Sequence, residues 1–103
     1  MYIIKRTIEA GPGTIPGEVM QAALQLAAYV RDKQGLDTET AVNVGGSQHE
    51  FHWIVRTDSL DILAAKTAER EADEEWQAMV QPMIESGLFK SGSIRDEILM
   101  VIG

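Results

Sequence analysis

Apolar side chains alternate with polar ones in four stretches of the chain, and in two longer stretches they recur every three to four residues. Successive side chains of a β-strand point to opposite faces, whereas a helix that packs on a core carries an apolar stripe at helical spacing. The alternation predicts strands over residues 2–9, 38–44, 48–56 and 94–102. The helical spacing predicts helices over residues 14–34 and from 58 or 59 to about 86.

Turn and cap residues lie at the ends of these stretches. Pro16 suits a first helical turn, and Gly35 suits a left-handed cap after the first helix. Asp58 and Ser59 are good N-caps for the second helix. A Gly45-Gly46 pair joins the second and third strands as a hairpin, so we expect these strands to pair antiparallel.

The second helical stretch contains two features that interrupt the apolar stripe. A charged run occupies residues 69–75, and Pro82 lies farther along. Proline removes a helical hydrogen bond, so we expect a kink or an interruption near Gln81. The stretch is therefore either one bent helix or two helices with a break inside the acidic run, whose charges indicate a solvated face.

The predicted order of elements, βαββαβ, is typical of a ferredoxin-like α+β fold. Residues 1–103 form one domain in this fold, a four-stranded antiparallel sheet with two helices on one face. The other face still carries apolar side chains, and an uncovered apolar face is expected to find a partner. The simplest partner is a second copy, so we expect a homodimer.

Composition and charge exclude several classes of protein. The net charge of −7 repels a polyanion and no basic patch offsets it, so we expect no nucleic-acid partner. The chain has no cysteine, which excludes disulfides and thiolate metal sites. No apolar run approaches the roughly 20 residues that span a bilayer, and the N-terminus lacks the pattern of a signal peptide. We therefore expect a soluble cytoplasmic protein without a membrane partner.

Three segments carry a family resemblance: YIIKRTIEAGPG at residues 2–13, HEFHWIVRTDSL at residues 49–60, and EADEEWQAMVQPM at residues 71–83. With the predicted topology, they resemble the NIPSNAP-like and antibiotic-biosynthesis-monooxygenase-like small domains of the dimeric α/β-barrel superfamily. The resemblance implies two sheets that close into a barrel across a dimer axis, with any ligand pocket between the sheet and the helices of one subunit.

The activities of that superfamily include cofactor-free oxygenation, haem degradation and isomerisation. The haem-degrading members use an Asn, a Trp and a His. Asn43, Trp53 and His52 are present here, but their order and spacing do not support a transfer of these roles. The resemblance is therefore specific for the fold and much less so for an activity.

The third strand holds both histidines of the chain, and imidazole titrates near neutral pH. His49 and His52 are candidates for a general base, and the alternative is a hydrogen-bonded histidine on the sheet surface. Alternation places them on opposite faces, so they cannot share one metal ion within a subunit. His49 is the stronger candidate because Phe51 and Trp53 share its face.

Other side chains are candidates for ligand contacts. Trp53, Phe51 and Trp76 could stack on a flat ligand, although large aromatic residues are more often core. Asn43, if it faces inward, could hold a ligand carbonyl or a water. Arg6 is either the ion-pair partner of Asp96 or an anchor for a substrate.

The sequence lacks calcium-loop, phosphate-loop, dinucleotide, zinc and serine-nucleophile motifs, so we expect no metal and no cofactor. Two hypotheses follow. The first is a dimeric protein that binds a small hydrophobic or aromatic molecule and oxygenates or isomerises it without a cofactor, with His49 or His52 as base and Asn43 or Arg6 as anion stabiliser. The second is a non-catalytic dimeric module with a structural or regulatory role. A pocket lined by a histidine and a tryptophan would favour the first, and a fully packed interior would favour the second.

Overall fold

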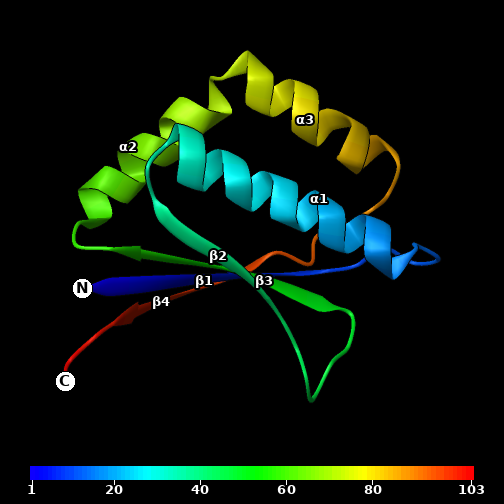
Figure 1. Cartoon of the computed structure of the whole chain (residues 1–103), viewed down its shortest axis with the longest axis horizontal. Helices are drawn as coiled ribbons and strands as arrows, with labels where there is room; N and C mark the ends of the chain where they lie inside the picture. Colours follow the sequence, from blue (N-terminus) through cyan, green and yellow to red (C-terminus); the bar gives the residue numbers. More distant parts are fainter.

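The computed structural model describes residues 1–103 as one four-stranded sheet with its helices on a single face (Figure 1). The strands are β1 (Tyr2–Glu9), β2 (Asp37–Val42), β3 (Glu50–Thr57) and β4 (Arg95–Met100). The helices are α1 (Pro16–Ala28), continued by a π-helical turn η1 (Tyr29–Lys33), α2 (Leu60–Glu71) and α3 (Glu74–Glu85). The sheet order is β2-β3-β1-β4 and every pair is antiparallel. The predicted α+β ferredoxin-like fold is confirmed.

The second helical region is two helices, and the break lies at Ala72–Asp73, inside the acidic run. Asp73 begins α3, because its carboxylate accepts the backbone N–H of Glu75 at 2.9 Å. Of the expected kink or interruption near Gln81, the interruption is wrong, since α3 continues through Pro82 to Glu85. Proline leaves only the carbonyl of Ala78 without its helical donor, and both residues are exposed, so water can bind that carbonyl.

The third strand is shorter than predicted at its start. β3 begins at Glu50, so His49 lies in the turn before it and is exposed. The connection between β2 and β3 therefore covers residues 43–49 and is longer than the Gly45-Gly46 pair suggested. Gly35 does adopt the predicted left-handed conformation, with φ 71°. None of the helices is long and apolar enough to cross a membrane.

The core lies between α1 and the middle of the sheet. Val19 and Ala23 of α1 are completely buried against Ile8 and Phe51. Small side chains on this side of α1 let the helix approach the strands closely. In contrast, α2 buries none of its residues and α3 buries only Met83, so these two helices stand farther from the sheet.

The helix-free face of the sheet is less apolar than the sequence pattern suggested. At one end, Ile3 and Leu99 pair directly across β1 and β4, and Ile54 on β3 lies diagonally from Ile3. The rest of the face is polar, and its charges are partly compensated across strands: Arg95 pairs with Glu50 at 3.0 Å, and Arg56 pairs with Glu39. The face therefore combines an apolar end with a charged remainder.

The loop after α3 is fixed to the end of β1 by a close backbone approach. The N–H of Gly11 donates to the carbonyl of Leu88 at 2.8 Å, and Ala10 forms an isolated bridge with Phe89. A Cβ added at Gly11 would lie 1.8 Å from the carbonyl oxygen of Gly87. Only glycine can occupy this position without moving the backbone.

We predict that Gly11→Ala lowers the free energy of unfolding by about 2 kcal/mol or more, because the new methyl group forces two backbone segments apart. The matched control is Gly17→Ala in α1, where an added Cβ meets nothing within 4 Å. That change should raise the free energy of unfolding by about 0.4–1 kcal/mol, since alanine is the better helix former. Urea denaturation measures both, and equal stability of the two variants would contradict the prediction.

Candidate functional site

A cavity of about 610 Å³ lies between the sheet and the helices. It occupies the space under α2 and α3, where those helices stand away from β1 and β4. Most of its 24 lining residues are apolar, and the apolar side chains come from every helix and from three strands. They include Ile4, Ile8, Leu26, Val30, Leu36, Trp53, Val55, Leu63, Trp76, Val80, Met83, Phe89 and Ile98.

Trp53 forms part of the wall that the sheet provides. Its indole N–H donates to the carbonyl of Ala23 at 2.9 Å, which fixes the ring against α1. The ring of Phe89 meets it edge to face, with centroids 6.0 Å apart. Phe51, on the same side of β3, is buried in the core and does not line this cavity. Of the two aromatic residues of β3 that were predicted to contact a ligand, Trp53 lines the cavity and Phe51 belongs to the core.

Trp76 forms part of the opposite wall, on α3. Its ring packs on Tyr29 with centroids 5.0 Å apart, and the guanidinium of Arg70 lies 5.1 Å from its centroid. Two tryptophans from the sheet and from a helix thus face one space, a common arrangement where a flat apolar molecule binds.

Arg6 and Asp96 form the ion pair that their polar positions in apolar strands indicated. The two bonds are parallel, Nε to Oδ1 at 2.8 Å and Nη2 to Oδ2 at 2.9 Å. The guanidinium holds the pKa of the Asp96 carboxyl below its usual range. Both side chains line the cavity, so the alternatives of ion pair and ligand contact do not exclude each other.

Arg70 is a cavity residue that the sequence reasoning missed. It lies in the last turn of α2, within the run 69–75, and its only signal was a positive charge among acidic neighbours. Its Nη1 donates to Oε1 of Gln34 at 2.7 Å, and Gln34 in turn donates to the carbonyl of Lys66 at 2.7 Å. Burial, and next the nearby charge of Arg6, lower the pKa of the Arg70 guanidinium.

The corner between α2 and α3 is tied to η1 through Asp73. Its carboxylate accepts a hydrogen bond from the hydroxyl of Tyr29 and lies 2.9 Å from Nζ of Lys33. These contacts, the Tyr29 hydrogen bond first, lower the pKa of Asp73 to about 2. The tie holds the corner over the cavity.

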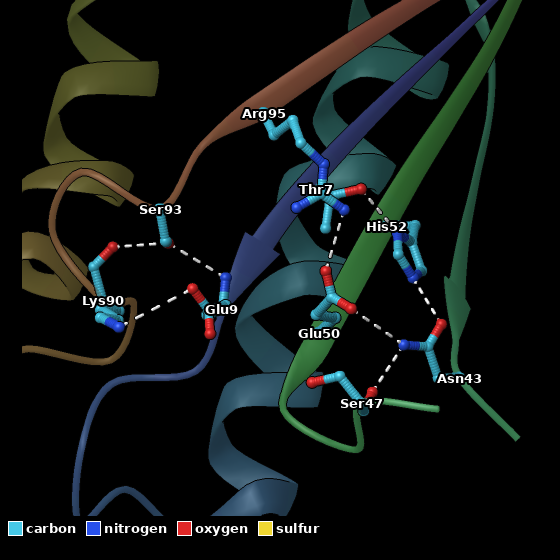
Figure 2. A network of polar contacts seen from close by, with 9 residues as sticks. All are labelled: Thr7, Glu9, Asn43, Ser47, Glu50, His52, Lys90, Ser93 and Arg95. Atoms are coloured by element: carbon cyan, nitrogen blue, oxygen red, sulfur yellow. Dashed lines mark hydrogen bonds and ion pairs between the residues drawn. The ribbon is translucent and has the colours of Figure 1, made fainter. Parts of the chain in front are cut away.

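His52 lies on the helix-free face and not in the cavity (Figure 2). Its Nδ1 is 2.8 Å from the hydroxyl of Thr7, and its Nε2 is 2.7 Å from Oδ1 of Asn43. The amide nitrogen of Asn43 donates to the carbonyl of Ser47 and to Glu50. Oδ1 of Asn43 therefore accepts, so His52 carries its proton on Nε2 and Nδ1 accepts from Thr7.

The two histidines and Asn43 are separate from the two tryptophans. His49 is exposed and lines a second, smaller pocket together with residues 9–14 and Phe51. Asn43 orients His52 and touches no cavity residue through its hydrogen bonds. Of the predicted site residues, the cavity contains Arg6, Trp53 and Trp76. No group of three or more metal-ligating side chains lies close enough to hold a metal ion.

Burial lowers the pKa of His52, with a further contribution from Lys5. A folded pKa below the unfolded value of about 6.5 means that the neutral ring stabilises the fold above that pH, and that this stability is lost as the pH falls through the folded pKa. We predict that the free energy of unfolding falls between pH 7.5 and 5.5, and falls less in His52→Gln, which does not titrate. Urea denaturation at fixed protein concentration measures this, with His49→Gln as control. The same pH dependence in wild type and His52→Gln would contradict it.

Comparison with known proteins places the fold among solved structures. A NIPSNAP domain protein from Burkholderia xenovorans superposes with a TM-score of 0.77 at 17% identity, over 99% of this chain and 95% of the other. A NIPSNAP family protein from Agrobacterium tumefaciens gives 0.73 at 19% identity, over 99% and 94%. A structure described as an antibiotic biosynthesis monooxygenase gives 0.71 at 14% identity, over the whole of both chains.

No family model matches the sequence, and neither does any curated protein. The structural matches extend over nearly the whole chain at low identity, so they establish the fold and leave the chemistry to be argued from the site. The resemblance expected from the three sequence segments is confirmed at that level. The chain has the ferredoxin-like fold that NIPSNAP domains share with antibiotic biosynthesis monooxygenase structures.

Proposed function

We propose that this domain binds a small hydrophobic or aromatic molecule in the cavity between the sheet and the helices. One observation carries the proposal: a cavity of about 610 Å³ has an apolar wall with tryptophans on opposite sides. Ligand sites in proteins range over roughly 300–1,000 Å³ and have few polar groups, and this cavity has both properties. The fold shared with a monooxygenase structure supports the same reading by analogy.

Binding, and not base catalysis by a histidine, is at the centre of the proposal. Cofactor-free oxygenation or isomerisation needs a group that takes a proton from the bound molecule. Neither His49 nor His52 lines the cavity, and the one carboxylate on its wall, Asp96, is engaged by Arg6. Arg6 remains a candidate anion stabiliser, as expected from the sequence. The second hypothesis, a non-catalytic dimeric module, is therefore kept in the form of a binding module. The fully packed interior that this hypothesis predicted is not present.

We predict that filling the cavity abolishes binding of a neutral aromatic probe. Leu63 lines the cavity from α2, so Leu63→Trp should reduce the affinity for 2-naphthalenemethanol at least tenfold by occupying its space. Isothermal titration calorimetry measures the affinity. The matched control is Ile62→Trp, one residue earlier in the same helix, which is 52% exposed and outside the cavity. No binding to the wild type, or equal binding by both variants, would overturn the proposal.

We also propose that the second copy expected from the sequence covers the helix-free face. β4 is an edge strand whose six residues are all exposed. Leu99 at the C-terminal end of β4 and Val101 just after it are exposed apolar residues. The charged remainder of the face contains both signs, among them Lys5, Glu97, Arg95 and Glu39, so a two-fold related copy can match opposite charges while it covers the apolar end.

We predict that the protein sediments at micromolar concentration with twice the mass of one chain. Leu99→Lys should raise the dissociation constant of the dimer at least tenfold, because it places a charge in the apolar end of the face. Ile62→Lys, on a helix away from that face, should leave the dimer intact. A wild-type protein that is monomeric under these conditions would contradict the proposed interface.

A further inference from the structure

Arg70 has no carboxylate partner in an acidic protein. The chain contains 16 acidic residues, and each of the other four arginines lies within 4.0 Å of one. Arg70 forms no such pair, although Glu69 and Glu71 are its neighbours in sequence. A guanidinium that is partly withdrawn from water without an anion loses solvation and gains little in return.

The protein instead fixes the orientation of this guanidinium toward the cavity. Gln34, only 8% exposed, accepts from Nη1 and is itself held by the backbone of Lys66. Trp76 lies under the guanidinium plane, where the aromatic face attracts a cation. Nε and Nη2 have no acceptor within the protein. Several N–H donors therefore remain available on a side chain that lines the cavity.

The net charge of the residues that line the cavity is positive, whereas the net charge of the whole chain is negative. The titratable lining residues are Arg6, Arg70, Lys90 and the single carboxylate Asp96, in a chain of net charge −7. Arg6 is neutralised by Asp96, and Lys90 lies 3.9 Å from Glu9 at the rim. The uncompensated charge inside is therefore that of Arg70.

We propose that the ligand of this cavity is a hydrophobic monocarboxylate, with its carboxylate on Arg70 and its apolar body between Trp53 and Trp76. A planar guanidinium with adjacent free donors matches the two oxygens of a carboxylate. A single unpaired cation in an otherwise apolar space calls for a single anionic group on an apolar body. This inference rests on the proposed binding function and adds the chemical class of the ligand.

The test compares three naphthalene probes that differ only in their polar group: 2-naphthoate, 2-naphthalenemethanol and 2-naphthylmethylammonium. In calorimetric titrations at pH 7.5 we expect the wild type to bind the carboxylate at least tenfold more tightly than the alcohol, and the ammonium most weakly. Arg70→Gln should remove the preference for the carboxylate, while the affinity for the alcohol stays within about twofold. Arg70→Lys should keep part of the preference, because it retains the charge without the planar donors.

The control variant is Arg31→Gln, which makes the same change of charge at an exposed arginine outside the cavity and should keep the preference. Circular dichroism shows whether each variant is folded. If Arg70→Gln does not fold, Arg70→Lys still tests the role of the planar donors. Equal affinity of the wild type for carboxylate and alcohol would overturn this inference and leave the proposed function intact. A preference that survives in Arg70→Gln but disappears in Arg6→Gln would also overturn it, because the anion would then lie on Arg6. Failure of all three probes to bind would overturn the proposed function itself.

Discussion

The cavity depends on the way one carboxylate, that of Asp73, holds the corner between α2 and α3. It begins α3 by accepting the N–H of Glu75, and it is tied to η1 by the hydroxyl of Tyr29 and the ammonium of Lys33. Because α2 buries none of its residues, apolar contact alone would hold this helix weakly against the sheet. The polar tie fixes the corner at a distance from the strands without filling the space below it.

The helix α1 contributes the opposite constraint. Its alanines and Val19 allow close contact with β3 and β1, so the sheet is well covered on one side of the helix layer. The same sheet face continues under α2 and α3, where side chains such as Ile98 remain exposed and have no helix packed directly on them. A cavity therefore results because α1 packs closely on the sheet whereas α2 and α3 lie farther from it.

The parts of this structure that were predictable from sequence depend on local backbone geometry. Alternation placed Trp53 and His52 on opposite faces, because strand side chains must point to opposite faces, and the structure shows that Trp53 is on the helix side. The polar breaks at Arg6 and Asp96 anticipated a pair between β1 and β4. What failed depends on tertiary context. Pro82 stays helical because its lost hydrogen bond faces solvent.

The candidate site was harder to predict than the fold for the same reason. His49 lies outside the strand because the hairpin connection is longer than its glycine pair implied. Arg70 is hidden in a charged run that is otherwise solvated, and its orienting partner Gln34 is 36 residues away in the sequence. No short-range pattern distinguishes an arginine that faces water from one that faces a cavity.

The net charge of this protein and the local charge of Arg70 have opposite effects on an anionic ligand. At physiological ionic strength the field of surface charges decays over about 8 Å, so the net charge of −7 opposes an approaching anion only near the surface. A negative net charge does not speed the association of an anionic ligand, whereas a positively charged entrance to the cavity would. Burial of the apolar body then supplies the affinity that carboxylate and alcohol probes share. Arg70 supplies selectivity, because its interaction with an anion is strongest where water is excluded.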